Sequence, residues 1–557
     1  MTATQRPATA IDHVADAWVD TFVQLIPEVG TYIGRTEQNH RHSDQTPAGH
    51  DAIAAAARNT VAALAELEPV DDIDAVTKTD LTAELNLMLE QYEAKTHLRD
   101  LNVIESPAQQ IRSVYDLMPT DTEDDWSIIS RRLSAVPAAI DGYIETLREG
   151  MRQGVVPARR QVLEVVTQIA RYTADDGFFA AFAAEAAPAD GELSAALLGE
   201  LGQHADLARG AYDTLASFMQ NELAPVATEQ DGVGREQYAL ASRRFLGATI
   251  DLDETYEWGI QELARMVAEQ EAIANEILPG ASVEEAVAFL EKDPSRKLQG
   301  TEALQKWMQE TSDRAVAELG ATHFDIPAEI RTLECMIAPT QEGGIYYTGP
   351  SDDFSRPGRM WWSVPEGVTE FDTWRELTTV YHEGVPGHHL QIGQGVANRA
   401  QLNSWRRQLA GSSGHAEGWA LYAERLMQQL GYLDDPADRL GMLDGQRMRA
   451  ARVVLDIGVH LGKPRLDGQG IWDADYALEF MMQNVNMPEA FVRFEVNRYL
   501  GWPGQAPSYK VGQRIWENVR DEVEAREGAD FDIKAFHKRA LDLGGVGLDT
   551  LRRALLG

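Results

Sequence analysis

The stretch Tyr381-His-Glu-Gly-Val-Pro-Gly-His-His-Leu-Gln391 holds three of the chain's 13 histidines within eight residues. Many zinc hydrolases build their site from a His-Glu pair and a nearby histidine, with two imidazole ligands and a glutamate base. The usual spacing puts the histidines at i and i+4 on one helix face. Here His388 stands at i+6 from His382, which a straight helix turns about 240° away. His389, at i+7, shares the face but lies about 10.5 Å further along.

Two residues between these histidines can change that geometry. Pro386 removes a backbone donor and clashes with the preceding turn, and Gly387 tolerates the dihedral angles that a bulge requires. Looping out about two residues would return His388 to the place of an i+4 ligand. The alternative is a His-rich helix end before a Pro-Gly break, and a His-Glu pair alone is weak evidence. The cluster together with its helix break favours a metal site.

The pattern His-Glu-x-x-Pro-Gly-His resembles the signature of the bacterial domain-of-unknown-function-885 family, which is similar to gluzincin-type zinc metallopeptidases. The resemblance continues in five further segments, which are Tyr346-Tyr347, Arg356-Pro357-Gly358, Glu417-Gly418-Trp419, Asp456-x-Gly458-x-His460 and Pro503-Gly504-Gln505-Ala506. It is detailed from Tyr346 onward and loose in the N-terminal part. The resemblance implies a mainly α-helical, cleft-containing peptidase-like fold with one zinc ion per chain.

The same resemblance gives the third metal ligand as Glu417. A carboxylate completes a two-His-one-Glu set and leaves a fourth position open for water. Glu424 lies two turns further on the same helix face, where it could support a ligand from behind, and His389 is a second candidate for such support. His415 is a rival third ligand because it is close and chemically able. We prefer Glu417 because the Glu-Gly-Trp run carries the resemblance.

A polar stripe follows one side of the otherwise apolar segment 440–461. Its members recur at spacings of three and four residues and are Gln446, Arg449, Arg452, Asp456 and His460. A buried stripe of this kind requires partners, and an internal ladder of salt bridges would suit the two arginines. His460, at the end of the stripe, is a candidate for stabilising an oxyanion, with Asp456 supporting it.

The late part of the chain offers groups that could contact a substrate. Related peptidases hold the tetrahedral intermediate with a tyrosine hydroxyl from a late helix, and the resemblance gives this role to Tyr509. Arg498 and Lys510 could bind a substrate carboxylate, although either could equally be a surface charge or part of an ion pair. Tyr347 and Arg356, in segments that carry the resemblance, are further candidates for substrate binding.

Composition limits the class of protein. With 557 residues, 44% hydrophobic and 25% charged, the chain is typical of a globular protein with a large core. The net charge of −38 argues against nucleic acid and anionic membranes as partners, because their phosphates would be repelled. The single Cys335 excludes an internal disulfide and suits a reducing compartment. No apolar leader or membrane-spanning run is apparent, so we expect a cytoplasmic protein.

Hydrophobic periodicity predicts helices along most of the chain. We expect a helical N-terminal shell over 1–250 and a catalytic helical region over 251–557, joined as one compact unit. β-Prone residues over 330–337, 344–348 and 359–364 predict one small sheet just before the site helix at 374–391. An edge of that sheet could pair with a substrate backbone, or the sheet could simply cover the core.

These observations predict a zinc-dependent hydrolase, foremost a metallopeptidase that cleaves short peptides with Glu383 as general base. It would act as a carboxypeptidase or an oligopeptidase, as a monomer or homodimer. Two alternatives stay open: a zinc hydrolase of non-peptide amides or esters, and an inactive peptide-binding protein on a peptidase scaffold.

Overall fold

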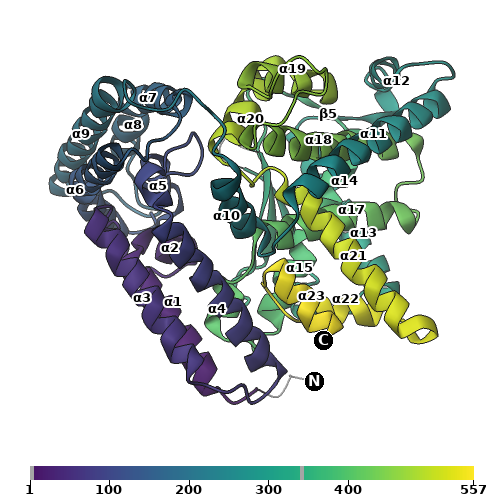
Figure 1. Ribbon diagram of the computed structural model, residues 1–557, viewed down its shortest axis with the longest axis horizontal. Coiled ribbons are helices and arrows are strands. Elements are labelled where there is room, and N and C mark those ends of the chain that lie inside the picture. The colour runs from purple at the N-terminus through teal and green to yellow at the C-terminus, as the bar shows by residue number, and fades with distance from the viewer. Residues whose placement is uncertain (1–4, 339–343) are drawn as a thin grey trace.

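The computed structural model describes residues 5–338 and 344–557. Helices make up most of this protein, and most of its short strands lie just before the helix that carries His382 (Figure 1). The expected mainly α-helical fold is therefore confirmed. Within the described residues, no helix is both long and apolar enough to cross a membrane.

The first half of the chain folds into ten α-helices among its described residues. They are α1 (Ala10–Leu25), α2 (Pro27–Tyr32), α3 (Pro47–Ala65), α4 (Asp72–Glu93), α5 (Pro107–Ser113), α6 (Glu123–Gln153), α7 (Arg159–Thr173), α8 (Phe178–Ala184), α9 (Ala195–Phe218) and α10 (Arg235–Leu246). Pro27 ends the first helix and begins the second, because proline is tolerated at a first helical position, where no donor is needed.

The second half supplies thirteen more α-helices within the described residues. They are α11 (Leu252–Ile277), α12 (Val283–Leu290), α13 (Thr301–Thr322), α14 (Thr373–Glu383), α15 (His388–Ala397), α16 (Ser404–Gln408), α17 (Ser413–Gln429), α18 (Pro436–His460), α19 (Ala474–Asn484), α20 (Glu489–Gly501), α21 (Ser508–Glu527), α22 (Ile533–Leu541) and α23 (Leu548–Leu556). The buried helix α18 packs against α11, α14 and α19, and it forms the centre of the largest hydrophobic core.

The strands form two small sheets. β2 (Leu333–Ile337), β4 (Gly358–Trp362) and β3 (Ile345–Thr348) make a three-stranded sheet in that order, with β4 parallel to β2 and antiparallel to β3. β1 (Lys297–Gln299) and β5 (Glu370–Asp372) pair antiparallel. The predicted sheet is confirmed, whereas the second pair was not predicted, because strands of three residues carry too little periodicity.

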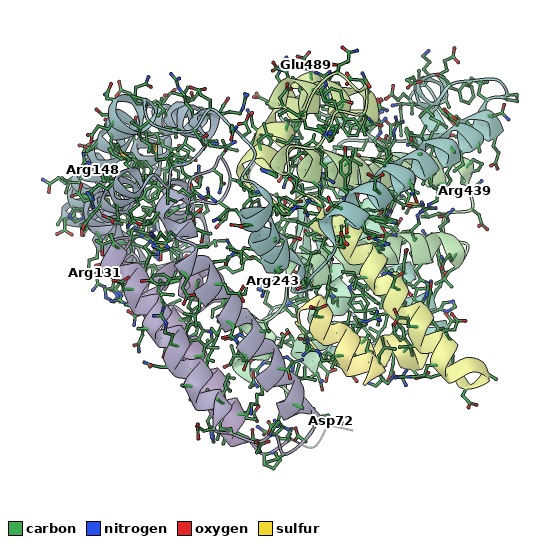
Figure 2. All side chains as sticks on the ribbon, in the orientation of Figure 1. Asp72, Arg131, Arg148, Arg243, Arg439 and Glu489 are labelled. Atoms are coloured by element: carbon green, nitrogen blue, oxygen red, sulfur yellow. The ribbon has the colours of Figure 1, made fainter. Side chains whose placement is uncertain are left out.

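The N-terminal helices contain two separate hydrophobic cores. Residues 101–224 pack among themselves, whereas α1, α3 and α4 share a core with Trp405 of α16. In Figure 1, α6 to α9 lie on the side opposite to α11 and α21. Figure 2 labels Arg243 of α10, whose Nη1 lies 2.5 Å from Oε2 of Glu90 of α4. This ion pair connects α10, which packs in the largest core, to the core that α4 shares with Trp405.

Candidate metal centre

The predicted site helix is interrupted where the sequence placed its Pro-Gly break. α14 ends at Glu383 and α15 begins at His388. A Cβ atom on Gly387 would lie 1.9 Å from the His382 carbonyl oxygen, a distance that no real side chain allows. Glycine is therefore required there, and the interruption brings the ring of His388 to within 4.9 Å of the His382 ring, centroid to centroid.

Helix α17 holds this interruption in place. Trp419 donates its Nε1–H to the carbonyl oxygen of Pro386 at 2.8 Å, across a fully buried contact. One residue earlier, a Cβ on Gly418 would lie 2.4 Å from the carbonyl carbon of Gly512, so only glycine lets α21 come this close. The Glu-Gly-Trp run therefore fixes both the helix break and the neighbouring helix α21.

The first residue of that run, Glu417, faces the histidines. Ser412 caps α17 by accepting the N–H of His415 at 3.2 Å, which places Glu417 in the second turn. Its Oε2 lies 3.3 Å from Nε2 of His382 and 3.5 Å from Nε2 of His388. Two imidazole nitrogens thus converge on one carboxylate oxygen.

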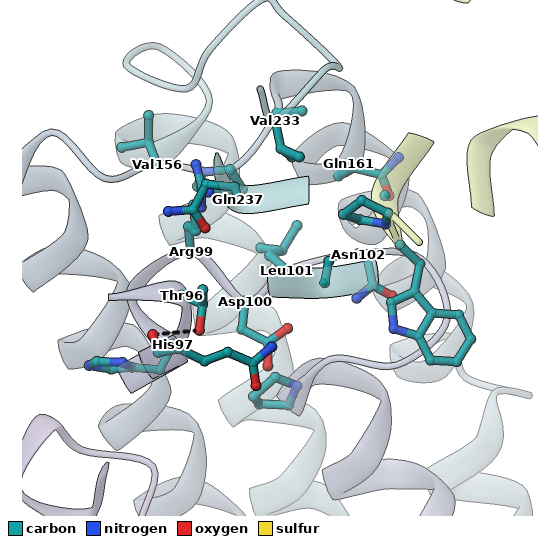
Figure 3. Close-up of a pocket in the computed structure, with 18 of the residues that line it drawn as sticks. Thr96, His97, Arg99, Asp100, Leu101, Asn102, Val156, Gln161, Val233 and Gln237 are labelled. Atoms are coloured by element: carbon teal, nitrogen blue, oxygen red, sulfur yellow. Dashed lines mark hydrogen bonds between the residues drawn. The ribbon is translucent and has the colours of Figure 1, made fainter. Parts of the chain in front are cut away.

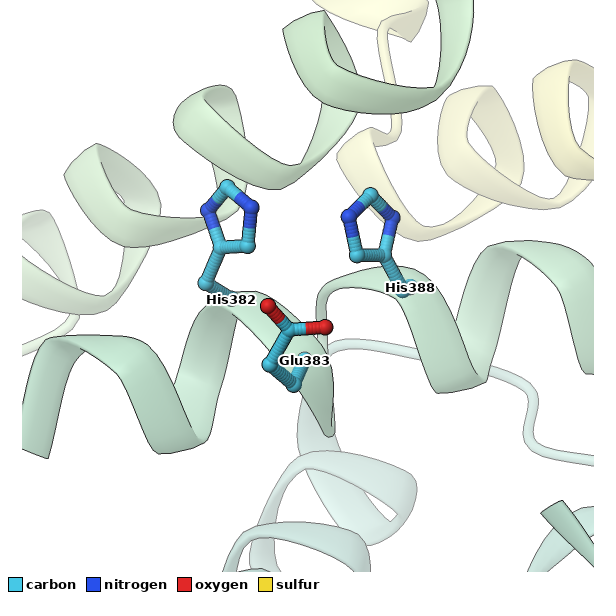
Figure 4. Close-up of side chains that lie close together, drawn as sticks. All are labelled: His382, Glu383 and His388. Carbon is cyan, nitrogen blue, oxygen red and sulfur yellow. The ribbon is translucent and has the colours of Figure 1, made fainter. Parts of the chain in front are cut away.

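Glu383 completes the cluster. Donor atoms of His382, Glu383 and His388 all lie within 4.8 Å of one another, and all three residues are buried. Figure 4 shows both rings projecting to the same side of the break, with the Glu383 carboxylate near both. Burial raises the pKa of Glu383, while the charges of the two histidines oppose that rise.

Glu424 orients the first imidazole from the opposite side. Its Oε1 accepts the Nδ1–H of His382 at 2.7 Å, and its Oε2 accepts an amide hydrogen from Gln446 at 3.2 Å. With Nδ1 directed to Glu424, Nε2 of His382 is the nitrogen that faces Glu417 and whose lone pair a bound metal would use. Burial disfavours the imidazolium form of His382. The hydrogen bonds with Glu417 and Glu424 nevertheless raise the pKa of His382 to about 10. The carboxylates around His382 therefore favour a positive charge at the cluster.

The donor set fits a divalent transition-metal ion. Two imidazoles and a carboxylate are the ligands of many catalytic zinc sites, which keep a fourth position open. Nδ1 of His388 is buried and has no hydrogen-bond partner among the described residues. The side chain of Glu417 is 23% exposed, against 6% for His382, so solvent reaches the cluster from the side of Glu417.

Comparisons with known proteins agree with the sequence resemblance. A family model described as "Bacterial protein of unknown function (DUF885)" matches residues 27–555. The chain belongs to this family. No curated protein matches this DUF885 protein.

Solved structures share its fold. A "putative lipoprotein from Colwellia psychrerythraea" has a TM-score of 0.86 at 21% identity, over 98% of this chain and 99% of that chain. A second "putative lipoprotein of unknown function", from Shewanella oneidensis, has a TM-score of 0.76 at 18% identity, over 99% and 100%. A carboxypeptidase from Pyrococcus furiosus is more distant, with a TM-score of 0.43 at 11% identity, over 99% and 96%. The two nearer likenesses establish the fold alone.

Tyr509 lies close enough to the cluster in the DUF885 protein for the charge of Glu417 to act on it. It stands in the first turn of α21, and its ring centroid is 5.3 Å from the guanidinium carbon of Arg452. Burial, followed by the charge of Glu417, raises the pKa of Tyr509 to about 12. Its hydroxyl group therefore stays protonated near neutral pH and can donate a hydrogen bond.

His389 does not face the cluster. It donates its Nε2–H to the carbonyl oxygen of Ile330 at 2.8 Å, and its Nδ1 accepts the hydroxyl hydrogen of Tyr347 at 2.9 Å. These two hydrogen bonds connect α15 to the sheet region, and the second of them occupies the Tyr347 hydroxyl. Arg356 donates to the carbonyl oxygen of Gly349 at 2.7 Å and so shapes a loop.

His460 and Asp456 lie elsewhere, which corrects the roles expected for them. His460 donates to the carbonyl oxygen of Tyr499 at 3.1 Å, and Asp456 accepts from the hydroxyl of Tyr238 at 2.7 Å. Asp456 and His460 follow Gln446 by ten and fourteen residues, or about 15 and 21 Å along α18. A polar stripe runs the length of a helix, so only one part of it reaches the site.

The two cations predicted to bind substrate are already paired. Arg498 donates Nη2–H to Glu495 at 2.8 Å and Nη1–H to Gln505 at 2.5 Å. Lys510 is 1% exposed, and its Nζ lies 3.0 Å from Oε1 of Glu262. Burial lowers the pKa of Lys510 to about 8, against the opposing charge of Glu262. Neither group is available for a substrate carboxylate.

The rival ligand His415 also points away. Its Nδ1 lies 3.3 Å from the amide nitrogen of Gln391, and its ring packs against Trp516. Burial lowers the pKa of His415 to about 3. Sequence reasoning missed the role of Gln446, which holds Glu424, although its position in the polar stripe was a usable signal.

A separate cavity of about 370 Å³ lies between the N-terminal helices and the end of α20 (Figure 3). Asp100, Gln161, Arg244 and Trp502 are among its lining residues, and no member of the histidine cluster is. This cavity is therefore distinct from the metal centre.

Proposed function

We propose that this DUF885 protein is a metal-dependent hydrolase, and specifically a zinc metallopeptidase that cleaves short peptides. One observation carries the proposal. Nε2 of His382 and Nε2 of His388 lie 3.3 and 3.5 Å from one oxygen of Glu417, with the Glu383 carboxylate beside them. A protein that only bound peptides would need neither this donor set nor the adjacent carboxylate.

One zinc ion per chain is the proposed cofactor, held by His382, His388 and Glu417. When bound, such an ion polarises a substrate carbonyl and lowers the pKa of a water ligand toward about 7. Glu424 keeps His382 in the tautomer that presents Nε2, through its contact of 2.7 Å with Nδ1.

Two further residues act in the proposed reaction, one on the proton of the water and one on the negative charge that develops. Glu383 accepts the proton of the attacking water and returns it to the leaving amine. Tyr509 donates its hydroxyl hydrogen to the oxygen on which negative charge develops. Its raised pKa supports this role, because a protonated phenol is required.

Burial of the site supports a small substrate. The side chains of His382 and His388 are only 6% and 11% exposed, so the surface of a folded protein cannot reach them. A flexible peptide, or a small amide or ester, can enter beside Glu417. The Glu383 carboxylate next to the donor set favours a catalyst over an inactive peptide-binding protein.

The decisive variant is Glu383→Gln, which keeps the shape of the side chain and cannot accept a proton. We expect zinc content to stay at one per chain while peptide turnover falls by about 10²-fold or more. Metal analysis of the purified protein and a peptide-library digest read by mass spectrometry measure both effects. Glu489→Gln, on the exposed face of α20 (Figure 2), is the matched control and should behave as wild type.

Two outcomes separate the possible failures. Wild-type turnover by Glu383→Gln would remove Glu383 as the base. Zinc-loaded wild type that cleaves amides or esters, and no peptide in the library, would identify a non-peptide hydrolase.

The proposal extends to compartment and partners. The cytoplasm is supported by the single cysteine, Cys335, which is buried and unpaired. The charge of −38 supports the absence of nucleic-acid and membrane partners, and we expect a monomer or homodimer. Cell fractionation and light scattering test these points.

A further inference from the structure

Arg449 is a cation at the metal centre with no partner of its own. Across residues 5–338 and 344–557, no hydrogen bond or ion pair involves its guanidinium, and its Nε is buried without a partner. The guanidinium carbon lies 5.7 Å from the ring centroid of Tyr509. Its positive charge also acts on the carboxylates of Glu383 and Glu424. This cation therefore borders the reacting centre.

The neighbouring cations differ from Arg449, because each is neutralised. Arg452 donates Nη2–H to Glu495 at 2.7 Å and Nε–H to the hydroxyl of Tyr499 at 2.6 Å. Arg498 shares the same Glu495. Arg452 and Arg498 are thus both paired with Glu495, whereas Arg449 has no ion-pair partner among the described residues.

A glycine on the same helix leaves room for this guanidinium. Gly445 lies one helical turn before Arg449 on α18, and a Cβ there would stand 2.6 Å from Nη1 of Arg449. The side chain thus lies back over its own helix, in space that is open because residue 445 is glycine. This direction is fixed by α18 and not by a salt bridge.

An unpaired, half-buried guanidinium is unfavourable until an anion reaches it. Its planar fork of donors fits a carboxylate with two parallel hydrogen bonds, which a lysine cannot reproduce. Glu424 is unable to serve as that anion, because both of its oxygens are engaged by His382 and Gln446. Among the described residues, Glu383 and Glu417 form no ion pair with Arg449 either, which leaves the anion to be supplied from outside the chain.

We infer that Arg449 binds the C-terminal carboxylate of a peptide substrate, which makes the protein a carboxypeptidase. The inference rests on the proposed function and specifies its substrate class. A carboxylate held beside Tyr509 and Glu383 places the last peptide bond at the cluster, and the bond broken releases one C-terminal amino acid.

The kinetic test compares one peptide with a free and with an amidated C-terminus. Wild type should prefer the free acid by about 10- to 100-fold in kcat/KM, as expected for one charge-assisted pair. Arg449→Ala should lose that preference through a higher KM for the acid, and Arg449→Lys should recover only part of it. The control is Arg439→Ala on the same helix, where the arginine pairs with Glu276 at the surface (Figure 2).

Gly445→Ala provides a second variant that keeps the arginine. Its methyl group displaces the guanidinium, so the preference for the free acid should fall although the charge is retained. Equal, measurable rates of wild type on both peptides would overturn the inference. A loss of kcat in Arg449→Ala that is equal for acid and amide would also overturn the inference. Arg449 would then stabilise the oxyanion and would not bind the C-terminal carboxylate.

Binding measurements separate this inference from the proposed function. Calorimetry on Glu383→Gln should show tighter binding of the acid than of the amide, and Arg449→Ala in that background should abolish the difference. This result would stand even if wild type cleaved no peptide, which would defeat the proposed function alone. Equal binding of acid and amide, or no binding of either, would overturn the role of Arg449.

Discussion

His388 and His389 are adjacent in sequence but differ in what their ring nitrogens contact. Nε2 of His388 lies 3.5 Å from Glu417, whereas both nitrogens of His389 are bonded to Ile330 and Tyr347. The sequence predicts a cluster here, because the residue types and the Pro-Gly break are visible in it. Which histidine faces inward depends on how many residues the break loops out, and only the fold determines that number.

Substitution of each histidine should separate the two roles. His388→Ala removes a donor from the cluster and should abolish tight zinc binding. His389→Ala should retain zinc, while stability falls by about 1–3 kcal/mol because buried groups lose their partners. Metal content after dialysis and denaturant unfolding measure the two effects. Loss of zinc in His389→Ala, with retention in His388→Ala, would reverse the assignment.

Charged residues show the limit of prediction from sequence at this scale. Arg498 and Lys510 are chemically suited to bind a carboxylate, and nothing local marks them as occupied. The partner of Lys510 is distant in sequence, Glu262 of α11, whereas Arg498 pairs with the nearby Glu495 and Gln505, a choice that depends on how α20 packs. A free cation is recognised only when all its neighbours are known, which is why Arg449 emerges from the structure.

At the scale of elements, periodicity predicted the long helices well. The helical shell expected over 1–250 ends with α10 (Arg235–Leu246), and the helical region expected over 251–557 begins with α11 (Leu252–Ile277). The short α19 was not predicted, and the site helix over 374–391 proved to be two helices. The Pro-Gly break itself is visible in the sequence, but the way in which it is held is not, because that depends on the contact of Trp419 with the Pro386 carbonyl oxygen.

Alanine substitution should have opposite effects at two glycines, Gly387 at the break and Gly395 in α15. Gly387→Ala places a methyl group 1.9 Å from the His382 carbonyl oxygen, so the break must shift, with loss of stability and of zinc binding. Gly395→Ala in α15 meets only an ordinary contact at 3.5 Å, and should stabilise the helix by up to about 1 kcal/mol. Thermal unfolding and metal content distinguish them, and a zinc-replete Gly387→Ala protein would contradict this account.

The whole molecule brings the metal centre together from helices that are distant in sequence. α14, α15 and α17 supply the proposed ligands, and α18 and α21 supply Arg449 and Tyr509. The N-terminal part reaches this assembly through the core around Trp405 and the ion pair of Arg243 with Glu90. Composition predicts a globular protein with a large core and periodicity predicts helices, but the separate core of residues 101–224 is visible only in the structure.

A metal that joins three helices should stabilise the whole molecule. Zinc bound only by the native state adds about 4 kcal/mol when its concentration is 1,000 times the dissociation constant. Removal of zinc with a chelator should therefore lower the melting temperature, and re-addition should restore it. Glu417→Ala should melt at a chelator-independent temperature, because Glu417 is the proposed ligand on α17, whereas Glu489→Gln should keep the wild-type response. A melting temperature of zinc-loaded wild type that does not change on chelation, with the metal shown to be removed, would contradict a centre that links these helices.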